Sequence, residues 1–201
     1  MERLQVKNDG YVRCQSSFYT VEDVLDGSVS YEFTPGVNPL IGEIDSGVWA
    51  VSYMLSMYPY RPKNFTLFQP PVATVDGKEM PLSELSRLTC YLDRSYPLFS
   101  SRRSVRKMVE RGLKRSGLSM RADDVKRLFA LDDMRFERPL RQNGNESYRA
   151  MAAIGYSFGR EVFCFPWFSA KRSKYFQGHF SFLLEVLARE GKTVIFPGSA
   201  L

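Results

Sequence analysis

The stretch Gly42-Glu-Ile-Asp-Ser-Gly-Val-Trp49 decides how this sequence is interpreted. Its two glycines have the spacing of a phosphate-binding loop, G-x-x-x-x-G-K-S/T, in which backbone N–H groups cradle the phosphates. Val48 replaces the lysine that would reach the phosphates, and Trp49 replaces the hydroxyl that would hold Mg²⁺. On its own, the spacing of Gly42 and Gly47 more often marks an ordinary turn. Its meaning therefore depends on the rest of the chain.

The first third of the chain predicts strands, and the remainder alternates helices with strands. Asn8-Asp9-Gly10 indicates a hairpin turn between strands 4–7 and 11–15. Leu40 and Ile41 end a strand before the glycine stretch, and 47–58 is apolar enough for a buried helix after it. The other predicted elements are strands at 28–33, 64–69, 72–75, 88–92, 161–165 and 193–196, a turn at 76–77, an extended loop at 96–99, and helices at 82–88, 104–131 (broken at Gly112 and Gly117), 145–158 and 180–190. Short apolar strands that alternate with helices favour a parallel α/β sheet.

The length and composition predict one compact globular domain. The chain has 201 residues, of which 44% are hydrophobic. It contains no run of about 18 apolar residues, and its first residues lack the apolar core of a signal peptide. Cys14, Cys90 and Cys164 have no metal-ligand spacing and fit a reducing cytosol, and His179 is the single histidine. No metal site is therefore expected.

The positive charge of the chain is concentrated in one segment. The formal net charge is +6, and residues 102–127, called here the basic segment, contain ten Lys or Arg against three acidic residues. Such a segment suits nucleic acid, anionic lipid or an acidic protein partner. The simpler interpretation is a solvated helix face. Aromatic residues are not interleaved with these charges, which argues against a platform for single-stranded nucleic acid.

Taken in order, these segments resemble the nucleotide-binding domain of an ATP-binding cassette (ABC) transporter over about residues 18–199. The resemblance implies an α/β fold, namely a P-loop NTPase-like ABC nucleotide-binding domain with an N-terminal antiparallel β lobe and a small helical subdomain. It implies a single domain, 1–201, in which about 1–93 and 150–201 form the core lobe and about 94–149 the helical subdomain. Phe18 or Tyr19 falls near the aromatic residue that stacks on adenine in this family.

The positions at which this family contacts phosphate, magnesium or attacking water carry unsuitable residues here. The glycine stretch corresponds to the phosphate loop, and Arg94 to the glutamine that binds magnesium and water. Pro166 and Trp167 correspond to the magnesium aspartate and the catalytic base, and Ser199 to the switch histidine. Hydrolysis requires phosphate clamping, metal and a positioned water together. The resemblance therefore implies an inactive ATPase homologue that uses no cofactor.

The segment Gln142-Asn-Gly-Asn-Glu146 corresponds to the family's LSGGQ signature. Gly144 keeps the middle glycine, while Asn143 replaces the serine and Asn145 the second glycine. Two interpretations remain open for this segment. In a face-to-face dimer it would donate hydrogen bonds to a γ-phosphate held by the partner. Alternatively, Asn143 or Asn145 caps the helix that follows.

The resemblance implies a structural or regulatory subunit of a membrane transporter complex that neither binds nor hydrolyses ATP. Its partners would be a transmembrane transporter subunit and either a competent ABC ATPase subunit or a second copy of the chain, at the cytoplasmic face of the membrane. Two alternatives remain open. One is a surface-binding module for nucleic acid or anionic lipid on the same scaffold, with nucleic acid the less expected partner. The other is different acid–base chemistry that uses Glu43, Asp45 and Ser46 or an Asp93–Arg94 pair.

Overall fold

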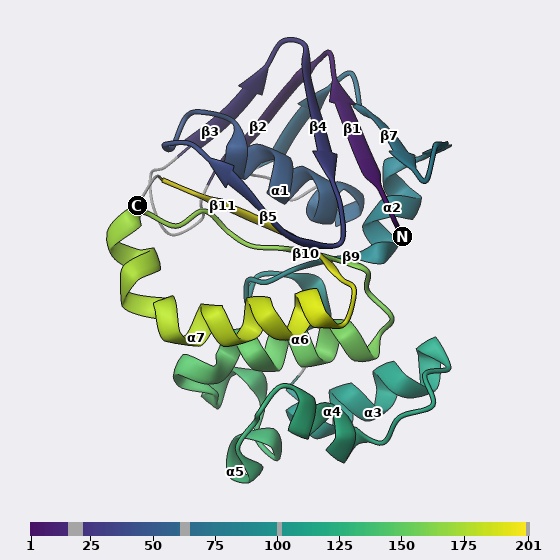
Figure 1. Ribbon diagram of the computed structural model, residues 1–201, viewed down its shortest axis with the longest axis vertical. Coiled ribbons are helices and arrows are strands. Elements are labelled where there is room, and N and C mark those ends of the chain that lie inside the picture. Colours follow the sequence, from purple (N-terminus) through teal and green to yellow (C-terminus); the bar gives the residue numbers. More distant parts are fainter. Residues whose placement is uncertain (16–21, 61–64, 100–101, 200–201) are drawn as a thin grey trace.

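The computed structural model describes residues 1–15, 22–60, 65–99 and 102–199, and it is built in layers (Figure 1). An antiparallel β lobe lies at one end, and helix α1 (Val48–Met57) lies between this lobe and a parallel sheet. Helices α6 (Ser147–Ser157) and α7 (Ala170–Arg189) cover the other face of the parallel sheet. Beyond them lie α3 (Val105–Ser116), α4 (Ala122–Leu128) and α5 (Asp133–Phe136). The predicted adenine-stacking residues Phe18 and Tyr19 fall outside the described residues.

The β lobe consists of two antiparallel sheets that continue one another in register. Its strands are β1 (Leu4–Asn8), β2 (Tyr11–Gln15), β3 (Glu22–Asp26), β4 (Val29–Phe33), β6 (Phe65–Phe68), β7 (Val72–Val75) and β8 (Lys78–Met80). β1 pairs with β4 and β7, and β2 pairs with β3 and β6. The register is continuous across the break, because Asn8 pairs with Val29 and Tyr11 pairs with Asp26. The predicted hairpin at 8–10 is therefore wrong: β1 and β2 are two halves of one bent strand.

Gly10 lies in this bend because another backbone passes too close for a side chain. A Cβ atom on Gly10 would lie 2.4 Å from the carbonyl oxygen of Phe68 and 2.6 Å from that of Gln69. A glycine inside a strand pattern often marks such a close approach, so the turn-like sequence here encodes a bend and not a reversal. The predicted turn at Asp76-Gly77 is confirmed, since both residues have positive φ and join β7 to β8.

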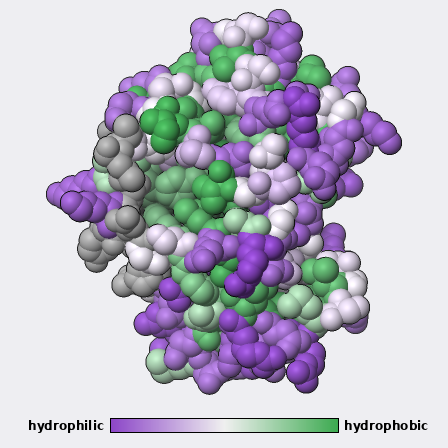
Figure 2. Space-filling model, in the orientation of Figure 1, coloured by the Kyte–Doolittle hydropathy of each residue, from purple (hydrophilic) through white to green (hydrophobic). Residues whose placement is uncertain are grey.

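The predicted parallel sheet is confirmed. Its strands are β5 (Gly36–Ile41), β9 (Thr89–Tyr91), β10 (Val162–Cys164) and β11 (Thr193–Gly198), in the order β5-β11-β10-β9 with all pairs parallel. α1 is buried along its whole length because it contacts both β2 and β3 of the lobe and β9, β10 and β11 of the parallel sheet. Figure 2 shows apolar side chains around β5, where Val37 and Ile41 are exposed.

The helices differ from the prediction at three places. α7 begins at Ala170, ten residues before the predicted 180. α3 (Val105–Ser116) runs through Gly112 without a break, and it ends as predicted at Gly117. Gly112 is needed for packing, since a Cβ atom there would lie 2.2 Å from Ser157 Oγ of α6. The predicted extended loop at 96–99 contains a short 3₁₀ helix, Pro97–Phe99. The remaining helices are α2 (Leu82–Leu88), α4 (Ala122–Leu128) and α5 (Asp133–Phe136).

The core below the parallel sheet is an aromatic cluster. It is formed by ring contacts among Tyr148 of α6, Phe180 of α7, and Phe165, Phe168 and Phe196. Gly155 allows α6 to approach the sheet, because a Cβ atom there would lie 2.6 Å from Cys90 Sγ. Among the described residues, no helix is both long and apolar enough to span a bilayer.

Candidate functional site

The predicted phosphate loop meets the ends of two other strands at the carboxyl edge of the parallel sheet. The Gly42 amide donates to the carbonyl of Gly198 at 3.0 Å, and Trp167 Nε1 donates to the carbonyl of Gly42 at 3.0 Å. Residues 42–49, 165–168 and 198–199 are called here the loop edge. In open α/β sheets, ligands bind beyond the carboxyl ends of the strands. The loop edge is therefore the place to look for chemistry.

The loop itself closes on its own backbone. The Ser46 hydroxyl donates to the carbonyl of Glu43 at 2.5 Å, and the Ser46 amide donates to the same carbonyl at 3.2 Å. Asp45 has a φ of 76° and Gly47 a φ of 82°, which place both in the left-handed region. Glu43, Asp45 and Ser46 are exposed. Ser46 is thus used to hold the loop shape.

Asp23 of β3, which the sequence analysis missed, occupies the N-terminal end of α1. Its Oδ1 accepts a hydrogen bond from the Gly47 amide at 2.9 Å, and its Oδ2 accepts one from the Ala50 amide at 2.8 Å. The side chain is fully buried. Burial raises the pKa of Asp23, while the backbone N–H groups of Gly47, Ala50, Trp49 and Asp45 lower it part of the way back.

A sequence signal for Asp23 exists in the alternation of β3. Along Glu22-Asp-Val-Leu-Asp26, Asp23 and Leu25 share the buried face, whereas Glu22 and Val24 are only half-buried. An aspartate in step with a core leucine is unusual, because a buried charge must be paired or hydrogen-bonded. This signal predicts a bonded carboxylate, but it does not say which backbone supplies the donors.

Val48 and Trp49, at the positions where the sequence resemblance places the lysine and the hydroxyl, are core residues. Both are buried, and Trp49 Nε1 donates to the hydroxyl of Tyr91 at 2.9 Å. Trp49 also packs edge-on against Tyr53 one turn later on α1. The pKa of Tyr91 is well above its ordinary value, mainly because the ring is buried. Trp49 therefore joins α1 to β9.

The residues after β10 and β11 are also used in internal contacts. Phe165 accepts a hydrogen bond at its carbonyl from Ser52 Oγ of α1 at 2.6 Å. Pro166 and Trp167 follow it and are half-buried. Ser199 Oγ accepts a hydrogen bond from the amide of Ala170, the first residue of α7, at 2.8 Å. The hydroxyl of Ser199 thus holds the start of a helix.

Arg94 is exposed in a turn after β9. The predicted Asp93–Arg94 pair is not formed among the described contacts, because Asp93 Oδ1 instead accepts hydrogen bonds from the Ser95 amide at 2.8 Å and the Ser95 hydroxyl at 2.6 Å. This local arrangement is a common use of aspartate in turns. The contacts of Asp93 therefore do not support acid–base chemistry by an Asp93–Arg94 pair.

Within the signature segment, Asn143 does not cap the helix that follows, which is one of the two capping interpretations left open. Asn143 is buried and its Nδ2 donates backwards to the carbonyl of Pro139 at 3.2 Å, so its side chain makes no cap bond to the 3₁₀ helix Gly144–Glu146. The N-cap of α6 is Glu146, whose Oε1 pairs with Arg135 at 2.9 Å. Gly144 is exposed with a φ of 52°. The side chain of Asn145 lies outside what the structure describes.

Candidate metal ligands do not gather in the described residues, where no group of three His, Cys, Asp or Glu side chains could hold an ion. The three cysteines are free and buried. Burial raises the pKa of Cys164 to about 12 and raises the pKa values of Cys14 and Cys90 further. Such thiols are unreactive, because the thiolate is the nucleophile and the metal ligand.

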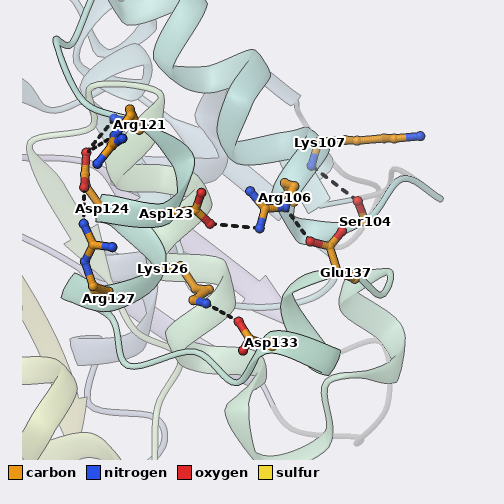
Figure 3. Close-up of polar contacts among 10 residues, drawn as sticks. All are labelled: Ser104, Arg106, Lys107, Arg121, Asp123, Asp124, Lys126, Arg127, Asp133 and Glu137. Atoms are coloured by element: carbon orange, nitrogen blue, oxygen red, sulfur yellow. Dashed lines mark hydrogen bonds and ion pairs between the residues drawn. The ribbon is translucent and has the colours of Figure 1, made fainter.

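Part of the basic segment is neutralised by ion pairs (Figure 3). Arg106 pairs with Asp123 and Glu137, Arg121 and Arg127 pair with Asp124, and Lys126 pairs with Asp133. The side chain of Lys107 points away from this network (Figure 3). Within the described part of the chain, no ion pair involves the exposed α3 residues Lys107, Arg111, Lys114 and Arg115. Much of the surplus charge of the segment therefore lies on α3.

No protein-family model and no curated protein matches this sequence, but solved structures match the fold. One is a putative ABC transporter ATP-binding protein from Pyrococcus furiosus, with a TM-score of 0.62 and 14% identity over 100% of this chain and 92% of that one. Another is a bacterial Atm1-family ABC exporter with ATP bound, with a TM-score of 0.56 and 15% identity over 100% of this chain and 35% of that one. The chain has an ABC nucleotide-binding-domain-like fold. The predicted fold class is confirmed.

Proposed function

We propose that this chain is a non-catalytic ABC-like subunit of a membrane transporter complex that neither binds nor hydrolyses ATP. The fold supports the ABC-like part of the proposal, since it matches ATP-binding domains over the whole chain. The chemistry of the loop edge supports the non-catalytic part. Its role would be structural or regulatory: to complete an interface or to hold one conformation of a transporter.

The observation that carries the proposal is the side-chain chemistry at the loop edge. Val48, Trp49, Pro166 and Trp167 stand where the family resemblance places the phosphate lysine, the metal ligands and the catalytic base. Aliphatic, indole and pyrrolidine side chains neither bind Mg²⁺ nor take up the proton of an attacking water. The indole of Trp167 is instead bonded to the first glycine of the loop.

The charge of the loop also opposes nucleotide binding. Glu43 and Asp45 are exposed on the loop, Asp23 lies behind it, and residues 42–49 include no lysine or arginine. A nucleotide triphosphate brought to this loop would meet like charges, and residues 42–49 would supply no compensating cation. Like charges at a few ångströms disfavour each other most strongly in sites with little water.

The partners of the proposed subunit are a transmembrane transporter subunit and either a competent ABC ATPase subunit or a second copy of the chain. Placement at the cytoplasmic face of the membrane follows from these partners. The Atm1-family neighbour is an ABC exporter, which supports a search for partners among transporter components. Gly144 of the signature segment is exposed in the single chain. In a dimer it would therefore be available to face a partner's nucleotide.

ATP turnover and ATP binding by the purified chain test the non-catalytic part. We expect no Mg²⁺-dependent phosphate release above background and no calorimetric signal on titration with ATP. Hydrolysis that co-purifies with the chain and is lost in Trp167→Ala would overturn this part.

Purification from native membranes in mild detergent tests the transporter part. We expect a membrane protein with several spans to co-purify with the tagged chain, with or without an intact ATPase. A chain that is recovered alone from the soluble fraction would overturn the transporter role but would leave the fold unchanged.

A second candidate function, binding to an anionic surface, is favoured by the exposed basic face of α3. Lys107, Arg111, Lys114 and Arg115 lie three or four residues apart and so share one side of the helix. Co-sedimentation with phosphatidylserine vesicles tests it: binding that falls steeply with added salt would support it. Equal recovery with neutral vesicles would count against it.

A further inference from the structure

We propose that Asp23 is a built-in anion that takes the place of a phosphate group in the loop and keeps the loop closed to phosphate-bearing ligands. The inference rests on the proposed function, in which the loop does not bind ATP, and gives it a structural cause. Loss of the lysine explains weak phosphate binding. An internal carboxylate in the position of the phosphate group explains why the loop keeps its shape with no phosphate present.

The loop retains the donors of a phosphate cradle, and Asp23 uses them. Gly47 is the N-cap of α1 and has no side chain to accept the free N–H groups of the first turn. The two Asp23 oxygens accept from the amides of Gly47 and Ala50 at 2.9 and 2.8 Å. Anions are favoured at such helix ends because the N–H groups and the helix dipole both point at them. Here that anion belongs to the chain itself.

Strand β3, which carries Asp23, packs closely against Gly47. β3 passes directly against this glycine: a Cβ atom on Gly47 would lie 2.9 Å from Leu25 Cδ1 and 3.0 Å from the carbonyl oxygen of Val24. The position of β3 is fixed by its ladder with β2, in which Asp23 pairs with Cys14. In the wild type, a phosphate that used the Gly47 and Ala50 amides would first have to displace the Asp23 carboxylate.

A helix cap and an anion cradle would use the same hydrogen bonds, but they differ in what happens when the carboxylate is removed. An emptied cradle accepts a free anion of suitable size, whereas an empty packing defect does not. Asp23→Ala deletes the carboxylate and leaves the Gly47 and Ala50 amides without their acceptor. Formate then stands for the lost carboxylate, and inorganic phosphate stands for a phosphate ligand.

The experiment compares the melting temperature of the full chain in sodium formate, sodium phosphate and sodium chloride at equal ionic strength. We expect Asp23→Ala to melt several degrees below the wild type in chloride and to regain at least half of that loss in formate or phosphate. The wild type should show only the general stabilisation that phosphate gives to folded proteins by its exclusion from their surface. The recovery of Asp23→Ala is therefore counted beyond the rise seen in the wild type. If Asp23→Ala does not fold in chloride, the refolded yield in each salt replaces the melting temperature.

Two control variants separate an anion cradle from general loss of stability. Ser52→Ala removes another buried α1 side chain bonded to backbone, at the Phe165 carbonyl, and should be destabilised without rescue by either anion. Asp23→Asn keeps the shape but fills the space with a neutral amide, so it should not be rescued either.

Equal melting temperatures of Asp23→Ala in all three salts would overturn the inference, as would an equal anion-specific rise in the wild type. Neither result bears on the non-catalytic function, which only ATP binding or turnover by the wild type would overturn. The two proposals therefore fail through different measurements.

Discussion

The loop edge and the surface of α3 and α4 are both rich in polar groups but use them in opposite ways. At the loop edge and in the elements packed against it, Asp23, Ser52 and Trp167 are bonded to backbone groups that are far away in the sequence. On α3 and α4, charged side chains pair with other charged side chains at the surface (Figure 3). Buried polar groups are costly to leave unpaired, whereas exposed ion pairs contribute little. The loop edge therefore holds the fold together, and the helical surface is available for partners.

The largest effect is expected from Trp49→Ser, which would restore a family-like hydroxyl to the loop. We expect a loss of about 3–5 kcal/mol in the free energy of unfolding, because a buried indole is deleted and the Tyr91 hydroxyl loses its donor. Urea denaturation measures this loss. Trp49→Phe is the matched control: it keeps one buried aromatic ring but loses the N–H and the rest of the indole, so it should cost less than Trp49→Ser. A stable Trp49→Ser protein with ATPase activity would contradict the conclusion that the loop edge serves to hold the fold together.

A smaller effect with a defined pH dependence is expected at Asp23. Because its pKa is raised in the folded state, the folded chain holds a proton on Asp23 over a pH window in which the unfolded chain has lost it. The window begins near the ordinary aspartate pKa of about 3.9 and ends at the raised value. The stability that this proton contributes is present below the window and is lost as the pH rises through it.

Asp23→Asn removes this titration and tests the sign. The free energy of unfolding of the wild type, minus that of the variant, should fall as the pH rises through the window and then stay level. Urea denaturation from about pH 4 to about pH 8 measures it. A difference that rises with pH would mean that the N–H donors outweigh burial and that the pKa is lowered instead.

A weaker effect is expected from Arg106, which joins the two acidic partners Asp123 and Glu137 and lies 4.8 Å over the ring of Phe136. We expect Arg106→Ala to lower the free energy of unfolding by less than about 1 kcal/mol, and added salt to reduce the difference. Arg127→Ala is the matched control, because Arg127 is exposed and has a single ion-pair partner, Asp124. It should melt at the same temperature as the wild type. A loss at Arg106 as large as that of Trp49→Ser would contradict the contrast between the two regions.

The smallest effect on stability is expected from Lys107→Glu/Lys114→Glu on the exposed face of α3. Its melting temperature should equal that of the wild type, because neither side chain has an ion pair within the described residues. Recovery of the membrane partner from detergent extracts should nevertheless fall if this face meets acidic groups. Unchanged recovery would place the partner contact on another surface.

Several features of the fold were predictable because they depend on local pattern. The strand, glycine loop and helix at 36–57 follow from apolar runs on both sides of the glycines, and the short apolar runs before Pro166 and Gly198 became parallel strands. The turn at Asp76-Gly77 follows from residues that tolerate positive φ. Other local signals misled: Asn8-Asp9-Gly10 has the composition of a turn, but the chain there continues as a bent strand.

The sequence by itself determined the side chains available at the loop edge, and so the absence of a lysine, a metal carboxylate and a base from the positions that the family resemblance assigns. Only the tertiary structure decided how those positions are used. Asp23 and Gly47 are 24 residues apart, and Trp167 and Gly42 are 125 residues apart. The glycines at 10 and 112 likewise matter because of backbone or side chains that reach them from other elements. Residue identity sets which chemistry is possible locally, whereas hydrogen-bond partners and close approaches are set by packing between elements that are distant in the chain.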